Sequence, residues 1–366
     1  MSDDLLYRIA LTMIPGVGGI TAKKLMAAFG SPQAVFEAPR TKLENILNVN
    51  SIRSFDKDRI LMQAKKELEF VKSNNVKTLF YTDDDYPLKL KLCDDAPAVL
   101  FVKGTVNLNN HKIISIVGTR NASNYGLSLC KKFIADLVAK GHRPVIVSGL
   151  AYGIDVCAHT SALSCGLDTV AVMGTPLNKV YPAPHENIAR QIEKQGALVS
   201  EFATNTATTQ GNFVSRNRII AGLADVTIIV ESSKKGGALL TANMALSYNR
   251  DVMAFPGRVG DEHSQGCNNL IKSNRAALLE SVEDLEYQMN WSTKSRSVQK
   301  QIEFVNLTEP EQDILNLLKN RESETVDVIS REVDIPLSEL SAFLLNMEFA
   351  EYITALPGNR YAIKGL

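Results

Sequence analysis

With 366 residues, 45% of them hydrophobic, the chain is long enough for two or three domains and apolar enough to bury a sizeable core, which excludes a disordered protein. Its 40 Lys and Arg residues balance 40 Asp and Glu residues. A net charge of zero excludes a protein that attracts polyanions with its whole surface, so any nucleic-acid site has to be a local basic patch.

Neither the cysteines nor the first residues point to an extracellular or membrane protein. The cysteines are odd in number and form no CxxC pair, which argues against a disulfide framework and a structural zinc site; they are Cys93, Cys130, Cys157, Cys165 and Cys267. Residues 1–4 (MSDD) lack the basic residues that open a signal peptide, and no continuous apolar stretch follows them. The sequence also has no run of about 18 apolar residues that could span a membrane. We therefore expect a cytoplasmic protein without a membrane span, a metal ion or a cofactor.

Residues 1–75 carry apolar side chains at helical spacing and predict a helical domain of the helix-hairpin-helix (SAM-like) type. Residues 14–20 (IPGVGGI) join two helical patterns, the second over residues 21–29. The glycines permit a tight turn with outward-facing amides, which suit a phosphate, and Lys23 and Lys24 follow. A glycine-rich turn in a helical bundle without DNA contact is an equal alternative.

Residues 76–288 alternate short β-branched runs with helical stretches. The runs cover residues 113–117, 145–147, 169–173, 197–199, 226–230 and 252–255. Such alternation predicts an α/β domain, a Rossmann-like core with a parallel sheet and helices on both faces.

Glycine-rich loops follow three of these expected strands, where ligands bind in open α/β sheets. Residues 118–121 (GTRN), 148–155 (SGLAYGID) and 232–238 (SSKKGGA) each lead into a helical stretch, and none is a GxGxxG dinucleotide turn. Backbone amides with nearby cations make a phosphate-binding surface that needs no catalytic nucleophile. The candidates are Gly118, Thr119, Arg120, Ser148, Gly149, Lys234, Gly236 and Gly237, and Lys235 adds a further positive charge.

A fourth segment, residues 213–218 (FVSRNR), favours a strand of nucleic acid over one small ligand. Single-strand binders combine base stacking on aromatic side chains with cationic contacts to phosphate. The candidates here are Phe213, Arg216, Asn217 and Arg218. The alternative interpretation buries the phenylalanine in the core and pairs one of the arginines with a carboxylate, Glu201 or Asp225.

Residues 289–303 are polar and indicate a linker, and residues 304–366 predict a small domain of their own. Helices over 309–317, 326–333 and 337–349, followed by strands over 352–354 and 360–363, are typical of a winged helix. From residue 305 to residue 366, five Lys and Arg residues stand against eleven Asp and Glu residues. Because an acidic surface repels phosphate, we interpret this domain as a protein-interaction module.

Seven stretches of the core, in the same order, resemble the DNA-processing protein A (DprA/Smf) family over residues 81–287. They are residues 117–120 (VGTR), 148–155 (SGLAYGID), 200–202 (SEF), 216–223 (RNRIIAGL), 237–242 (GALLTA), 255–258 (FPGR) and 266–271 (GCNNLI). The resemblance implies a homodimeric, non-enzymatic protein that protects incoming single-stranded DNA and loads the RecA recombinase in natural transformation and recombination. A single-stranded-DNA-binding protein is a further candidate partner.

The resemblance also implies roles for individual residues. It makes Arg120 a DNA contact and matches Lys179 to a lysine implicated in DNA binding. Phe213 and residues 216–218 match the family's segment of an aromatic residue followed by arginines. Two places depart from the family pattern: residues 174–179 read GTPLNK instead of GxGLD before Tyr-Pro, and Val214 stands where the family has proline.

A nucleotide-processing enzyme on the same fold, similar to phosphoribohydrolases, is the alternative function. Glu201 and Glu231 end expected strands, and Asp155 and His159 lie four residues apart on one expected helix. Those enzymes carry a PGGxGTxxE motif, whose glutamate is missing in register after Gly236. We expect the aspartate to stabilise the start of its helix and the histidine to be its partner.

Overall fold

The computed structural model describes residues 2–291 and 307–363, except residues 320, 322, 351, 357 and 358. The chain divides into two compact units, Met1–Thr293 and Lys294–Leu366. Of the expected linker 289–303, residues 292–303 lie outside the described part, and residue 289 ends helix α14 (Val282–Met289). Among the described residues, no helix is both long and apolar enough to cross a membrane.

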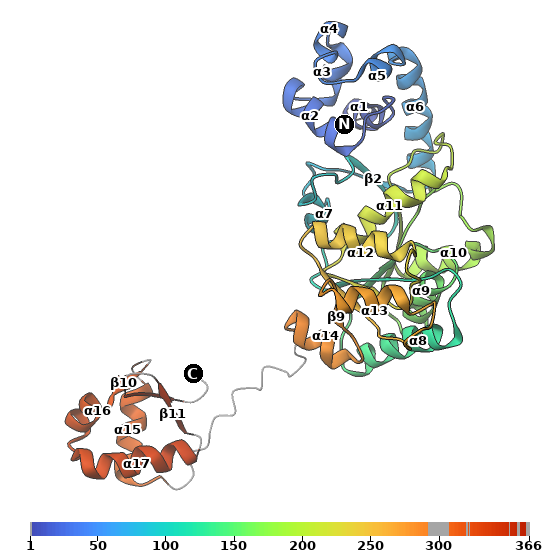
Figure 1. Ribbon diagram of the computed structural model, residues 1–366. Coiled ribbons are helices and arrows are strands. Elements are labelled where there is room, and N and C mark those ends of the chain that lie inside the picture. Colours follow the sequence, from blue (N-terminus) through green and yellow to red (C-terminus); the bar gives the residue numbers. More distant parts are fainter. Residues whose placement is uncertain are drawn as a thin grey trace. The chain divides into compact units, whose positions relative to one another are not determined.

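Six helices open the first unit, as the periodicity of residues 1–75 predicts. They are α1 (Ser2–Thr12), α2 (Gly19–Phe29), α3 (Pro32–Glu37), α4 (Arg40–Leu43), α5 (Val49–Arg53) and α6 (Lys57–Ser73), and they gather at one end of the unit (Figure 1). Their core includes Ile9 and Leu25 and continues into Val99 and Phe101 of the sheet. The helices and the sheet therefore share one hydrophobic core.

A nine-stranded sheet forms the centre of the first unit, in the order β1-β2-β6-β5-β4-β3-β7-β8-β9. The six predicted strands are all present: β3 (Ile113–Val117), β4 (Val145–Ser148), β5 (Thr169–Val172), β6 (Ala197–Ser200), β7 (Val226–Ile229) and β8 (Asp251–Ala254). These six strands pair in parallel, as predicted. Three further strands were not predicted: β1 (Lys77–Phe80) and β2 (Val99–Gly104), which form an antiparallel edge, and β9 (Ala277–Leu278).

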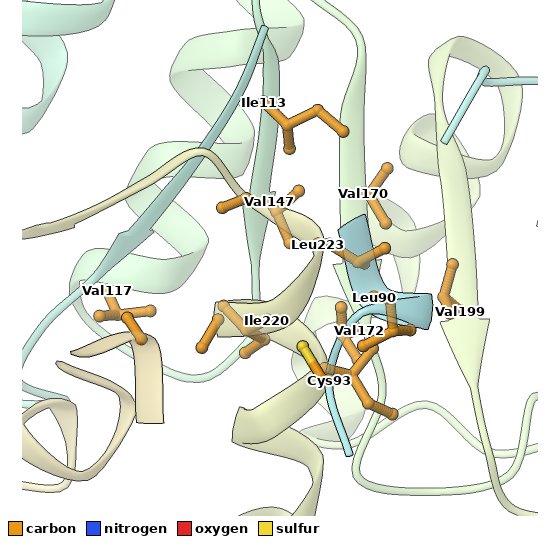
Figure 2. Packing of buried hydrophobic residues seen from close by; sticks show 14 of the residues in the cluster. Leu90, Cys93, Ile113, Val117, Val147, Val170, Val172, Val199, Ile220 and Leu223 are labelled. Carbon is orange, nitrogen blue, oxygen red and sulfur yellow. The ribbon is translucent and has the colours of Figure 1, made fainter. Parts of the chain in front are cut away.

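Alternating side chains of the strands supply the two faces of the sheet, because successive residues of a strand point to opposite sides. Ile113 and Val117 of β3 pack in one cluster, and Ile114 and Ile116 pack in another. Figure 2 shows the first cluster, where strand valines meet side chains of α7 (Leu88–Lys91) and α11 (Gln210–Leu223). Helices α12 (Ala238–Ser247) and α13 (Gln265–Lys272) complete this face.

The opposite face is covered by α8 (Asn124–Ala139), α9 (Ile154–Ser164) and α14, whose side chains share a core with Ile114 and Ile116. Towards the β6 edge, α10 (Glu186–Gln195) covers β5 and β6. The chain runs from β3 outward through β4, β5 and β6, then returns to the other side of β3 for β7 and β8. This reversal creates a crevice beside the carboxyl end of β3, the usual ligand site of open α/β sheets.

The second unit is a winged helix, as predicted. Helices α15 (Glu309–Lys319), α16 (Val326–Val333) and α17 (Leu337–Phe349) pack on strands in the order β10-β12-β11, which are β10 (Glu324–Thr325), β11 (Ile353–Leu356) and β12 (Arg360–Ile363). Its buried core includes Ile314, Leu344 and Ile363.

Candidate nucleic-acid interface

A cavity of about 750 Å³ lies at the carboxyl ends of β3, β4 and β7, where the chain reverses its direction across the sheet. We call it the switch cavity. It combines loop residues with residues of α11 and α12. The predicted site residues that line it are Gly118, Thr119, Arg120, Phe213, Arg216, Asn217, Gly236 and Gly237.

The loop after β4 packs closely against the loop after β3 because the residue at their contact, Gly153, has no side chain. Gly153 has a φ of 76°, and a Cβ atom there would lie 2.2 Å from the carbonyl oxygen of Thr119. Thr119 also accepts a hydrogen bond from the Ile154 amide (3.3 Å) and donates one to the Glu231 carbonyl oxygen (2.8 Å). Backbone contacts thus hold the three loops of the switch cavity together.

Arg120 is exposed at the rim of this cavity. Its side chain makes no hydrogen bond or ion pair with any residue in the described part of the chain. A guanidinium in this position presents its donors to a ligand without contributing to the core.

Arg216, in contrast, is 4% exposed and supports the cavity from below. Its Nη1 donates to the carbonyl oxygens of Gly149 (2.7 Å) and Val172. Burial lowers the Arg216 pKa to about 10, and the charge of Asp155 opposes this shift. Burial also raises the pKa of the Asp155 carboxyl, which Arg216 opposes in turn. The two charges, both in the lining of the cavity, therefore compensate each other.

An aromatic pair forms one wall of the switch cavity. The rings of Phe213 and Tyr181 lie with centroids 5.0 Å apart and planes tilted by 50°. Phe213 is half-buried and Tyr181 is 49% exposed. Gly174 lies directly against Phe213, since a Cβ atom there would be 2.4 Å from its Cδ1. The alternative that buries Phe213 in the core is therefore not what the structure has.

Lys179 and Lys234 are exposed and lie beside this cavity in sequence, two residues from Tyr181 and from Gly236. Neither lines the cavity itself. Within the described residues their ammonium groups make no hydrogen bond or ion pair, so both are free to bind a phosphate outside the cavity.

Three further predicted site residues do not line the switch cavity, and one of them, Gly149, accepts the hydrogen bond from Arg216 described above. Ser148 is buried, and its Oγ donates to the Ile116 carbonyl oxygen (2.7 Å). Arg218 is ion-paired with Glu201 and donates to the Asp95 carbonyl oxygen (2.5 Å), which is the alternative weighed for one of the arginines. The Arg218 guanidinium and the Ser148 hydroxyl are thus committed to internal contacts, so neither is available to a DNA strand.

The carboxylates considered for an enzyme have structural partners. Glu231 accepts hydrogen bonds from the Ser123 amide (2.9 Å) and hydroxyl (2.5 Å) at the start of α8. Buried His159 contacts the Thr169 hydroxyl (2.7 Å), and burial lowers its pKa to about 3. Asp155 was expected as its partner; instead Asp155 lines the switch cavity, where the charge of Arg216 opposes the rise of its pKa.

Several lining residues were not predicted. Tyr181 is the most exposed aromatic of the cavity, and its place two residues after Lys179 is the signal in the sequence that points to it. Residues 208–210 (TTQ), at the start of α11, have no signal beyond their position before a helix.

Two family profiles match the chain. The one described as DNA recombination-mediator protein A matches residues 77–290, and the one described as DprA winged helix domain matches residues 305–359. Among curated relatives, the protein Smf of Escherichia coli strain K12 is 35% identical over 282 residues, which covers 75% of this chain and 74% of that protein.

Two solved structures also resemble the chain. The X-ray structure of DNA processing protein A from Streptococcus pneumoniae has a TM-score of 0.64 at 30% identity and covers 77% of this chain and 97% of that one. A Helicobacter pylori DNA processing protein A, described for its single-stranded DNA binding mode, has a TM-score of 0.53 at 26% identity. It covers 59% of this chain and 96% of that one.

Proposed function

Because the chain belongs to the DNA recombination-mediator protein A (DprA/Smf) family, we propose that it binds single-stranded DNA in the switch cavity and acts as an accessory protein of recombination. The observation that carries the proposal is the position of Arg120, exposed and unpaired among the described residues, beside the rings of Tyr181 and Phe213. A cation next to an aromatic wall is the arrangement that single-strand binders use. The Helicobacter pylori relative, described as a single-strand binder, supports the same conclusion.

In this proposal each part of the cavity contacts one part of a nucleotide. A base stacks on Tyr181 and Phe213, which is worth about 1–3 kcal/mol per base. Arg120 binds a phosphate, and the backbone amides near Gly236 and Gly237 contact the same strand. Lys179 and Lys234 contact phosphates on either side of the cavity.

The protein acts by binding, without bond chemistry. Neither Glu201 nor Glu231 lines the switch cavity, and Asp155 is compensated by Arg216. Phosphoribohydrolase activity is tested by incubating the protein with nucleoside monophosphates and assaying for free base. We expect none above the blank.

The finer role follows from the family resemblance. The protein works in the cytoplasm as a homodimer, protects incoming single strands in natural transformation and delivers them to RecA, with a single-stranded-DNA-binding protein as a further partner. The acidic winged helix serves as a protein contact, since its charge opposes DNA binding. A RecA strand-exchange assay with and without the protein tests the delivery step.

The direct test of the proposed function is the affinity of the full chain for fluorescent oligo-dT, measured by anisotropy. The variant Tyr181→Ala/Phe213→Ala removes the stacking wall, and we expect a loss of at least tenfold. Tyr125→Ala, an equally exposed tyrosine outside the cavity, is the matched control. No binding of oligo-dT by the wild-type protein contradicts the proposal.

A further inference from the structure

A small recess lies beside the switch cavity, at its aromatic wall. Its volume is about 30 Å³, and we call it the side recess. Its lining residues are Arg120, Ala151, Tyr181, Phe213 and Arg216, which it shares with the switch cavity, and Gly149, Tyr152 and Pro182, which it does not share. A water molecule needs about 10–15 Å³, so the recess takes one small group and is far too small for a whole base.

The walls of the side recess are largely apolar. The residues that make them so are Ala151, Tyr152, Tyr181, Pro182 and Phe213. Two of its polar groups already bind each other, since Nη1 of Arg216 donates to the carbonyl oxygen of Gly149 (2.7 Å). Because an enclosed water molecule needs about two to four polar partners, an apolar group fits this recess better than water does.

Contacts within the protein hold the walls of the side recess in place. The ring of Tyr152 lies edge-on to that of His185, with centroids 4.9 Å apart and planes at 70°. His185 is fixed in turn, because its Nδ1 contacts the carbonyl oxygen of Leu150 (2.8 Å). Tyr181 packs against Phe213 in a similar way. Both tyrosines are still about half exposed, 47% and 49%, so a ligand from solution can reach the recess.

A base bound in the switch cavity brings one of its edges to this recess. Tyr181 and Phe213, the rings on which the base stacks in the proposed function, line both spaces. A substituent at the edge of the stacked base therefore has the recess beside it. Of the four DNA bases, thymine offers an apolar substituent there, its C5-methyl group. Uracil is the same ring without this methyl group.

We propose that the side recess receives the C5-methyl group of a thymine, so that the site selects thymine over the uracil of RNA. This inference rests on the proposed function. Burial of one methyl group corresponds to about fourfold tighter binding, or about 0.8 kcal/mol. Tyr152 lines the recess without lining the switch cavity, so it determines this selection and not the stacking of the base.

The test compares oligo-dT with oligo-dU, two strands of about 20 nucleotides that have the same sugar and differ only in the methyl group. For the full-length wild type we expect anisotropy to show about fourfold tighter binding of oligo-dT. The variant Ala151→Val adds two carbon atoms to the wall of the recess and should bring the ratio of the two affinities close to one. Ala28→Val, at an exposed alanine of α2 outside the recess and the switch cavity, should keep the ratio of the wild type.

A second pair of variants covers the case in which Ala151→Val does not fold. Tyr152→Ala removes one wall of the recess, so that the methyl group of a bound thymine stays in contact with water. Because about half of this tyrosine is exposed, its loss should leave the fold intact, which thermal melting checks. We expect the ratio of the oligo-dT and oligo-dU affinities to fall below about twofold. Tyr125→Ala, at a tyrosine that is 54% exposed and lines neither space, should keep the full ratio.

The outcomes separate this inference from the proposed function. If the wild type binds oligo-dT and oligo-dU equally well, the recess receives no methyl group and the switch cavity stands. A preference for oligo-dT that persists in every folded variant of Ala151 and Tyr152 comes from the stacking of the methylated ring alone, and it also contradicts the recess. If the wild type binds neither strand, the proposed function itself is wrong.

Discussion

Nη1 of Arg216 donates a 2.7 Å hydrogen bond to the carbonyl oxygen of Gly149, across the floor of the switch cavity. The contact requires a glycine, since a Cβ atom at position 149 would lie 2.6 Å from the guanidinium carbon. The next residue, Leu150, is buried with a φ of 58°, an unfavourable conformation for a branched side chain. Arg216 therefore holds the loop after β4 in a shape that this loop would not adopt alone.

The variant Arg216→Met should destabilise the protein strongly. Methionine keeps much of the side-chain length but leaves the Asp155 carboxylate buried without its compensating charge. Leaving a buried charge uncompensated in this way costs about 3–5 kcal/mol of the free energy of unfolding. Urea denaturation measures the loss, and Arg216→Met/Asp155→Asn should recover part of it. If the double variant is no more stable than the single one, Asp155 is not the group that Arg216 compensates.

The destabilisation by Arg216→Met should also depend on pH. Burial raises the folded-state pKa of Asp155, so its contribution to stability is fully present below the unfolded pKa and is lost as pH rises through the folded pKa. Arg216 opposes this rise of the Asp155 pKa, so removing Arg216 enlarges the loss of stability at high pH. The difference in Tm between wild type and variant should therefore be larger at about pH 7.5 than at about pH 4. Equal differences at both pH values would mean that Asp155 does not ionise in the folded protein.

The variant Arg120→Ala should weaken binding while leaving stability unchanged. A charged hydrogen bond is worth about 1.5–3 kcal/mol, which corresponds to a loss of roughly 10- to 100-fold in affinity for oligo-dT. The matched control is Arg143→Ala. Arg143 is an exposed arginine just before β4, at the amino-terminal ends of the strands and opposite the switch cavity. Anisotropy and thermal melting of both variants are the measurements. If the two variants bind equally well, Arg120 is not a DNA contact.

The salt dependence of binding should reflect few phosphate contacts. Single strands lose affinity with a slope of about −0.7 per phosphate in a plot of log affinity against log salt. Arg216 and Arg218 are committed to internal contacts, so the cations among the proposed DNA contacts are Arg120, Lys179 and Lys234, and we expect a slope of about −2. Lys179→Gln and Lys234→Gln should each make the slope shallower by about 0.7. An unchanged slope in either variant removes that lysine from the contact set.

The sequence predicts the central fold well because strand and helix patterns alternate regularly from residue 113 to residue 255. It does not predict β2, since no helix separates β2 from β3 and the alternation rule does not apply there. Strand β9 has only two residues, too few to show a period. The antiparallel edge and the last strand therefore depend on pairing partners that only the folded chain reveals.

For the candidate site, the sequence predicts some residues and misses others. Residues 213, 217 and 220 share one face of α11, whereas residue 218 lies about 200° from residue 216 around a helix with 3.6 residues per turn. This spacing indicates that Arg216 and Arg218 point in different directions, and the structure places them at different cavities. The burial of Ser148 and the partnership of Tyr181 with Phe213 depend on distant segments and have no local signal.

Deletion of residues 302–366 should leave the affinity for oligo-dT within about threefold of wild type, a change of less than about 1 kcal/mol. The deleted domain carries more than twice as many acidic as basic residues, and its helix α17 includes Glu339 and Glu348. The deletion variant keeps residues 1–75, because their core continues into Val99 and Phe101 of the sheet, and removing them would expose that surface. The remaining chain contains the compact unit Met1–Thr293 and should melt at an unchanged temperature. Anisotropy with the deletion variant gives the affinity, and melting confirms that it is folded. A folded variant that loses more than tenfold in affinity would place an essential DNA contact in the winged helix, against its charge.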